Sequence, residues 1–235
     1  MPYSTFDVAG LAAYLHLSPQ QVKRLAERDK LPGRRVGGEW RFARAEIHHW
    51  LESRIGVADE EDLVEVEGVL QRNAPAHHQH EVSIAEMLPA EAIAVPLHAR
   101  TRDSVIRAMV DLAGGTGLLW DPSAMADAVR QREEMHPTAL DGGIALLHPR
   151  RPMEKILGEA FLALGVTGSG IPFGAGVPMS DIFWLICSTD DRRHLQTLAR
   201  LSRILAAPGF LDALREADSP QAILDVIAET EQQLA

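Results

Sequence analysis

One stretch near the middle of the chain combines a helix end, a glycine turn, a buried strand and a histidine. A helix that carries Arg132 must stop at Pro137, because proline has no amide hydrogen to continue the helical hydrogen bonds. Residues 141–143, with the sequence Asp-Gly-Gly, are typical of a turn, and the apolar run 144–147 predicts a short buried strand. We therefore expect His148 to be held at the strand's end, beside the glycine turn and reachable from outside. The fold can bring Arg132 close to it.

These residues resemble the active-site signature of a known family. The signature joins an Arg-Glu pair, a threonine-glycine turn, an Ile-Ala-Ile-Pro-His strand end and a later His-Leu-x-x-Leu segment, which correspond here to 132–133, 138–143, 144–148 and 194–198. On these motifs, residues 81–234 resemble the phosphotransferase-system enzyme IIA domain of the fructose/mannitol class, which includes the nitrogen-regulatory IIA proteins. The chain departs from the family pattern at 139–141, where Ala-Leu-Asp replaces Gly-Ile-Gly, and at Leu147, which replaces a proline.

The resemblance implies that His148 is phosphorylated by a histidine phosphocarrier, HPr or a relative, and that His194 and Arg132 support the reaction. Phosphoryl transfer depends mostly on positioning and electrostatics, and a guanidinium fork suits phosphate oxygens. Glu133 either orients Arg132 or is a charge on the helix surface. Each residue also has an interpretation without a role in catalysis: His148 as a packed or exposed histidine, His194 as a residue of the helix surface, and Arg132 as an ordinary ion-pair partner on its helix. No cofactor and no metal are expected.

Residues 81–235 predict an α/β domain, in which a mixed sheet is covered by helices on both faces, because strands alternate with helices. The expected helices are 84–89, 101–113, Pro122 through Arg132, 190–205 with His194 in its first turn, and Ser219 to the end; the expected strands are 92–97, 144–147, 157–165 and 182–187. The continuous apolar run 182–187 is expected to be a central strand. Its Cys187 is then a buried thiol rather than a nucleophile.

The first 54 residues carry two helix starts and a glycine pair. Asp7 can cap a first helix that runs to Leu15, with Val8, Leu11, Ala12 and Leu15 on one face. The segment 18–21, Ser-Pro-Gln-Gln, predicts a capping box for a second helix, 19–27, which buries Val22 and Leu25. Gly37-Gly38 predicts a hairpin, and a third helix, 44–54, is expected to carry Ile47, Trp50 and Leu51 inward. The first two helices, joined by a tight turn and with a polar, basic face on the second, follow the helix-turn-helix plan.

The same segment resembles the excisionase/MerR-like winged helix-turn-helix family. The matching residues are Leu17, Ser18, Val22, Leu25, Leu31, Pro32, Arg35, Val36, Gly37, Arg41, Phe42, Ile47, Trp50 and Leu51. The resemblance implies that the second helix enters the major groove of double-stranded DNA and that the hairpin meets its backbone. The groove residues would be Gln20, Gln21, Lys23 and Arg24, and the phosphate contacts Arg34, Arg35 and Arg41.

Charge is distributed unevenly along the chain. Residues 1–54 hold nine Lys/Arg against six Asp/Glu, whereas the rest holds 14 against 27. A basic front end on an acidic body favours nucleic-acid binding by the front end, although any single charge can equally belong to a solvated face.

Residues 55–80 read as a linker, with an acidic run followed by His77, His78 and His80. Three histidines could bind a metal, but no cysteine or carboxylate set completes a structural zinc site, so a solvated linker is favoured. The chain has no apolar run near the roughly 20 residues that span a bilayer. The single cysteine and the absence of a signal pattern at the start predict a cytoplasmic protein.

Together these features predict a DNA-binding transcriptional regulator, with domains 1–54 and 81–235 joined by a linker, whose second domain accepts a phosphoryl group on His148. Paired DNA half-sites favour a homodimer. One alternative is a phosphocarrier that relays phosphate to a IIB protein, so whether the chain is itself an enzyme stays open. The other is a degenerate domain, altered at 139–141 and Leu147, that only binds a partner or a ligand.

Overall fold

The structure is a computed structural model of the chain, which describes residues 5–15, 17–44, 46–47, 50, 82–135, 137–173 and 179–234. The chain divides into two compact units, Met1–Glu81 and Val82–Ala235, called here the N-terminal and C-terminal units. Several predictions lie outside the described residues: the linker 55–80 with its histidine cluster, and most of the third helix, including Leu51. None of the helices in the described part of the chain is long and apolar enough to cross a membrane.

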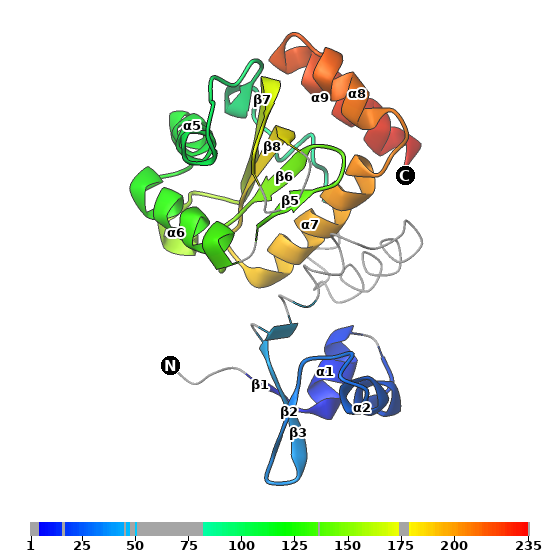
Figure 1. Cartoon of the computed structure of the whole chain (residues 1–235). Coiled ribbons are helices and arrows are strands. Elements are labelled where there is room, and N and C mark those ends of the chain that lie inside the picture. The colour runs from blue at the N-terminus through cyan, green and yellow to red at the C-terminus, as the bar shows by residue number, and fades with distance from the viewer. Residues whose placement is uncertain are drawn as a thin grey trace. The chain divides into compact units, whose positions relative to one another are not determined.

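The N-terminal unit is a small winged helix-turn-helix (Figure 1). Its elements are β1 (Thr5–Phe6), α1 (Val8–Leu15), α2 (Pro19–Glu27), β2 (Arg34–Val36) and β3 (Glu39–Ala43). The three strands form an antiparallel sheet in the order β1-β3-β2. The hairpin of β2 and β3 is called the wing.

The helix starts and the wing turn follow local chemistry. The predicted capping box at α2 is present: the Ser18 side chain accepts from Gln21 N, and the Gln21 side chain accepts from Ser18 N. The Asp7 carboxylate accepts from Gly10 N at 2.7 Å, as expected for a cap. Gly37 and Gly38 adopt φ angles of 62° and 85°, which a two-residue hairpin turn requires.

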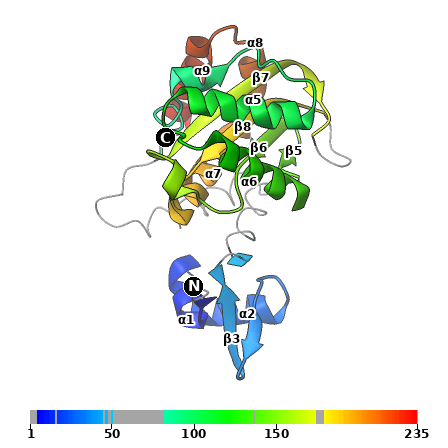
Figure 2. The ribbon, with the colours of Figure 1, turned by 90° about the vertical axis from the view of Figure 1, so that its left-hand side faces the viewer.

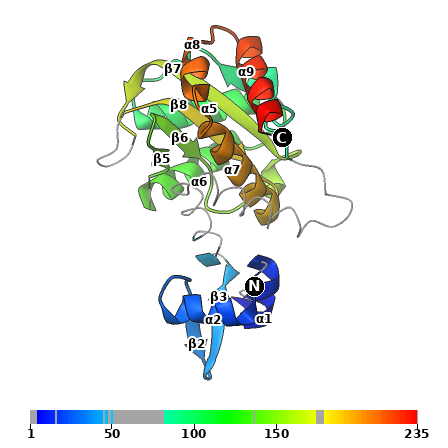
Figure 3. The same ribbon diagram turned by 90° about the vertical axis from the view of Figure 1, so that its right-hand side faces the viewer.

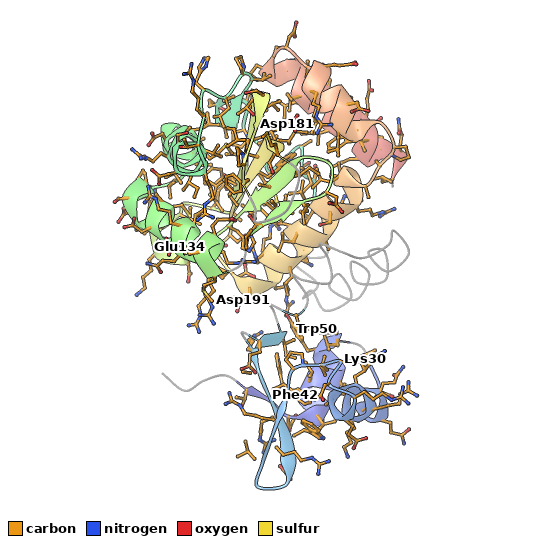
Figure 4. The ribbon with its side chains drawn as sticks, viewed as in Figure 1. Lys30, Phe42, Trp50, Glu134, Asp181 and Asp191 are labelled. Atoms are coloured by element: carbon orange, nitrogen blue, oxygen red, sulfur yellow. The ribbon has the colours of Figure 1, made fainter. Side chains whose placement is uncertain are left out.

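A continuous apolar core joins these elements. Its buried members are Leu11, Ala12, Leu15, Val22, Ala26, Leu31, Phe42 and Ile47. The expectation that Leu25 is buried was wrong: it is half-buried, and Ala26, one position on, faces the core instead. Of the predicted inward residues of the third helix, Ile47 is buried and Trp50 donates from its indole Nε1 to the Lys30 carbonyl at 2.9 Å (Figure 4).

The C-terminal unit is a mixed five-stranded sheet with helices on both faces. The strands are β4 (Ile93–Ala94), β5 (Ala139–Leu140), β6 (Ile144–Leu147), β7 (Phe161–Ile171) and β8 (Ser180–Cys187), and the helices are η2 (Ala90–Ala92), α5 (Arg102–Gly115), α6 (Pro122–Met135), η3 (Glu154–Ile156), α7 (Asp191–Leu205), α8 (Phe210–Glu216) and α9 (Pro220–Gln233). The order is β4-β7-β8-β6-β5, in which β6 and β8 are parallel and β7 and β8 antiparallel. Figure 2 shows α5 and α6 in front of one face, and Figure 3 shows α7 and α9 in front of the other. The predicted α/β class is confirmed.

The sheet's interior follows the apolar runs of the sequence. Strand β8 is buried along almost its whole length, including Cys187. Burial raises the pKa of the Cys187 thiol, so it stays protonated and unreactive. The expectation of a core thiol is confirmed.

Three predicted elements were misplaced. The expected helix at 84–89 is a series of turns: Met87 N donates to the Ser83 carbonyl, but Pro89 has no amide hydrogen to continue the helical bonds. The expected strand 92–97 is paired only over β4, and Pro96 has no amide hydrogen to extend it. The strand expected at 157–165 begins instead at Phe161, and α8 was not predicted at all.

Candidate functional site

Two histidines meet where two parallel strands end. His148 directly follows β6, and His194 lies in the first turn of α7, the helix that follows β8. Because β6 and β8 are neighbouring parallel strands, their carboxyl ends share one edge of the sheet, where ligand sites of α/β folds gather. The two ring centroids are 5.1 Å apart. The structure therefore brings together two residues that are separated by a whole antiparallel strand in sequence.

The His148 ring is held in one tautomer. Its Nδ1 lies 2.8 Å from the Leu146 carbonyl oxygen. A carbonyl oxygen can only accept, so Nδ1 carries the hydrogen and Nε2 keeps the lone pair. The side chain is only 3% exposed, so the expectation of a histidine open to solvent was wrong: the ring is fixed and almost covered.

The His194 ring is also buried, at 5% exposed, rather than lying on the helix surface. Its Nδ1 is 3.2 Å from the hydroxyl of Ser188, the first residue after β8. Asp190 caps the helix by accepting from Arg193 N. The N-cap carboxylate of α7 is thus bound to a backbone amide three positions further along the chain, and His194 follows directly after Arg193.

Arg132 and Glu133 lie in the last turn of α6, and both side chains are buried. Arg132 is 7% exposed and Glu133 is 1% exposed, so Glu133 is no surface charge. Its carboxylate accepts from Thr138 N at 3.2 Å and also from the Thr138 hydroxyl. Burial raises the pKa of Glu133, while the bonds from Thr138 and the nearby Arg132 charge oppose that rise. Glu133 thus anchors the chain after α6.

The glycine turn lies far from His148, contrary to the expectation. Gly143 precedes β6, and its carbonyl accepts from Asp181 N at 2.8 Å, at the start of β8. The turn and His148 are therefore at opposite ends of β6; Gly143 and His148 are five residues and thus roughly 16 Å apart, at about 3.3 Å per residue. Figure 4 shows Asp181 at one end of the sheet and Asp191, which begins α7, at the other.

Arg215 holds that turn. Its guanidinium binds the Asp181 carboxylate through two nitrogens at 2.8 and 2.9 Å, and it also donates to the Gly142 carbonyl. The residues that depart from the family signature at 139–140 form strand β5, which pairs with β6. The altered Asp141 belongs to the remote turn, whereas the altered Leu147 is buried directly before His148.

Two contributors to this site escaped the sequence analysis. Ser188 lies between the apolar strand β8 and Asp190, the N-cap of α7. This position in the sequence could have indicated that its hydroxyl lies at the edge of the sheet, near the start of the next helix. The bond between Glu133 and Thr138 joins two residues of the family signature, but the pattern alone does not say that they touch. Within the described ranges, no group of three or more histidine, cysteine or acidic side chains could hold a metal.

The predicted DNA-contact residues of α2 are exposed; they are Gln20, Gln21, Lys23 and Arg24. Gln21 also serves the capping box, so its side chain has a structural task at the helix start.

The wing arginines divide between two faces. Arg34 and Arg41 are direct cross-strand partners, so their side chains share a face. Arg35 pairs with Trp40 on the other face, and its guanidinium lies 5.2 Å from the Trp40 ring centre. Arg41 also binds Glu39 at 2.9 Å. All three arginines lie on the strands of the wing, as predicted. Because side chains alternate between the two faces of a strand, Arg35 is on the face opposite Arg34 and Arg41.

Comparisons with known proteins agree with both halves of the architecture. The family described as "Phosphoenolpyruvate-dependent sugar phosphotransferase system, EIIA 2" matches residues 86–230, and that described as "Helix-turn-helix domain" matches residues 5–55. The fructose-specific EIIA component of Haloferax volcanii is 30% identical over 149 residues, 62% of this chain and 95% of that protein. The nitrogen regulatory protein of Escherichia coli is 26% identical over 156 residues, 64% of this chain and 92% of that protein.

A larger relative shows that such domains also occur within longer chains. The fructose-specific EIIABC component of Bacillus subtilis is 29% identical over 150 residues, and this chain spans only 23% of its length. Among solved structures, IIA-Ntr of Neisseria meningitidis has a TM-score of 0.55 at 17% identity, covering 61% of this chain and 98% of that one. IIA mannitol of E. coli has a TM-score of 0.54 at 21% identity, covering 59% and 97%. These two share the fold of the C-terminal unit.

Proposed function

Because the chain belongs to the EIIA 2 family of the phosphoenolpyruvate-dependent sugar phosphotransferase system, we propose that His148 accepts a phosphoryl group from a histidine phosphocarrier. The observation that carries this proposal is the pair of buried rings, 5.1 Å apart, with the Nδ1 of His148 bound to a carbonyl. That geometry leaves Nε2 as the nucleophile.

In the proposed step, the Nε2 lone pair attacks the phosphorus of the carrier's phosphohistidine in line. The new nitrogen–phosphorus bond forms as the carrier's nitrogen–phosphorus bond breaks, and that electron pair leaves with the carrier's imidazole. The hydrogen on Nδ1 stays in its bond to Leu146, so the ring gains positive charge that offsets the phosphoryl oxygens. Arg132 supplies further positive charge and His194 a ring N–H donor, the kind of stabilisation on which this reaction depends.

We also propose that the N-terminal unit binds double-stranded DNA, so that the chain is a transcriptional regulator whose DNA binding responds to the state of His148. The support is the helix-turn-helix match, the exposed residues of α2 and the basic excess of residues 1–54. Helix-turn-helix proteins commonly read paired half-sites, which two copies of this chain would supply.

A second candidate keeps phosphate relay as the main task. It is favoured by the sugar-specific relatives, whose fructose-specific names describe those proteins. On this reading, phosphate passes from His148 to a IIB protein, and the DNA-binding unit only localises the relay. Rapid loss of label from His148 to a IIB protein would support it, whereas stable label that changes DNA affinity would support the regulator.

The site is tested with phosphoenolpyruvate, enzyme I and a phosphocarrier, followed by mass mapping of acid-labile phosphate. We expect one phosphate on the peptide that contains His148, and slower labelling in both Arg132→Ala and His194→Ala. Arg130→Ala, whose guanidinium binds Asp103 and Asp127, is the matched control and should label normally. No phosphate with a carrier proven active on another IIA domain would instead favour a degenerate domain that binds only a partner or ligand.

DNA binding is expected to weaken steeply with salt. Each phosphate contact contributes a slope of about −0.9 in a plot of log affinity against log salt. We expect Arg24→Ala to weaken binding and to reduce that slope by roughly one contact, as measured by fluorescence anisotropy from about 50 to 200 mM salt. Arg100→Ala removes the same charge from the C-terminal unit and should leave the slope unchanged. An affinity indifferent to salt would remove the DNA assignment.

A further inference from the structure

A line of hydrogen bonds connects the end of α6 to the His148 ring. The Glu133 carboxylate accepts from both the amide and the hydroxyl of Thr138. The Thr138 carbonyl accepts from Leu146 N at 3.2 Å. The Leu146 carbonyl then accepts from His148 Nδ1 at 2.8 Å. Glu133 therefore binds Thr138, Thr138 binds Leu146, and Leu146 binds the His148 ring.

From this line we propose that Glu133 and Thr138 are positioning residues that hold His148 in its Nδ1–H tautomer and so make Nε2 the nitrogen that takes phosphate. The inference deepens the proposed function and rests on it, since it concerns the same site and the same reaction. Neither residue is required to touch the phosphoryl group. They act through the backbone of Leu146, whose carbonyl selects the tautomer.

The tautomer needs such a device because free histidine in water prefers the opposite form, with the hydrogen on Nε2. That form would present Nε2 to the phosphocarrier with no lone pair. A carbonyl oxygen at Nδ1 reverses the preference only if it stays in place, since hydrogen bonds weaken steeply when the angle at the donor falls. Leu146 is the last but one residue of β6, where it pairs with Trp184 of β8 on one side and donates its amide to the Thr138 carbonyl on the other.

The Glu133–Thr138 contact restrains this strand end on the side of β5. Thr138 precedes the two residues of β5, so the ladder between β5 and β6 is short, with two paired positions. Without an anchor, a two-residue edge strand would fray. The buried carboxylate ties Thr138 to α6 at two points, and Thr138 in turn keeps Leu146 N in its bond. Glu133 is 1% exposed, so water competes little for these donors.

The test measures the tautomer directly in the unphosphorylated full-length protein, by the nitrogen-15 chemical shifts and couplings of the His148 ring. Thr138→Val removes the hydroxyl and keeps the side-chain shape, whereas Thr138→Ser keeps the hydroxyl. We expect the ratio of the Nε2–H to the Nδ1–H form to rise by about fivefold in Thr138→Val, the factor that one hydrogen bond represents. Thr138→Ser should restore the wild-type ratio.

Glu133→Gln is the second variant: the amide and the hydroxyl of Thr138 both donate to the same carboxylate oxygen, and a neutral amide oxygen accepts them more weakly than a charged one, so the ratio should shift in the same direction. Thr167→Val is the matched control: Thr167 is a buried threonine of β7 whose hydroxyl donates to the Ser169 carbonyl. A folded Thr138→Val and a folded Glu133→Gln that both keep the wild-type ratio would overturn the proposal.

A second measurement separates this inference from the proposed function. Phosphorus NMR distinguishes phosphate on Nε2 from phosphate on Nδ1, and we expect the Nδ1 product to increase in Thr138→Val. If the wild-type protein takes up no phosphate from an active carrier, the proposed function fails, while the tautomer measurement still decides the positioning role. If uptake is normal and the tautomer is unchanged in both variants, the proposed function stands and the positioning role fails.

Discussion

Replacing His148 by alanine is expected to abolish phosphoryl uptake, a loss of more than about 10³-fold, because a covalent carrier without its nucleophile has no alternative step. The neighbouring ring, His194, has its Nδ1 at the Ser188 hydroxyl. In the proposed mechanism it stabilises phosphate oxygens rather than replacing the nucleophile. The rate of label transfer from the phosphocarrier measures the effect.

The control for this variant is His98→Ala, which removes an exposed histidine from the same unit and should label at the wild-type rate. Because His148 is buried, His148→Asn is a second variant that fills more of the space and retains a polar group towards the Leu146 carbonyl. Both His148 variants should be unlabelled and folded. Phosphate on His194 in a folded His148→Ala protein would mean that the two histidines have been assigned in the wrong order.

Much of the fold could be predicted because the signals are local. The capping box at Ser18, the caps at Asp190 and Ser219, and the Gly37-Gly38 turn each depend on neighbours within a few residues. The apolar run that forms β8 has an equally local signal, since a strand buried on both faces needs no polar positions. Local chemistry therefore located most helices and the central strand.

The site could be predicted only in part, because its geometry depends on pairing between distant strands. The identity of the two histidines followed from the family signature, but their approach depends on β6 lying parallel to β8, with β7 intervening in sequence. The glycine turn was misplaced for the same reason: nearness to His148 in sequence hid the length of the strand between them. Likewise, the amide of Ile84 donates to a carboxylate on α9, 147 residues further along the chain, a contact that the local sequence does not indicate.

That carboxylate belongs to Glu231, which joins the last helix to the first turns of the C-terminal unit. It accepts from Ile84 N at 2.9 Å, Ala85 N at 3.1 Å and the Ser83 hydroxyl at 2.9 Å. The guanidinium of Arg200, on α7, lies 3.3 Å away, and both side chains are almost fully buried. Figure 3 shows α9 running beside α7. Glu231 therefore holds together three segments that are far apart in sequence.

We expect Glu231→Ala to lower the free energy of unfolding of the C-terminal unit by about 3 to 5 kcal/mol, because the change leaves the Arg200 charge buried without this acceptor and two amides without theirs. Chemical denaturation of the full chain measures it. Glu231→Gln keeps the shape and one acceptor, so its loss should be smaller.

Glu229→Ala is the matched control, since Glu229 is an exposed carboxylate on the same helix, and its effect should stay within about 0.5 kcal/mol. The comparison separates the carboxylate's contacts from any general effect of charge on α9. If Glu231→Ala were as stable as Glu229→Ala, the turns at 84–88 would have to be held by their apolar contacts alone. Burial of Ile84, Met87 and Leu88 would then account for the stability of this segment, rather than the Glu231 carboxylate.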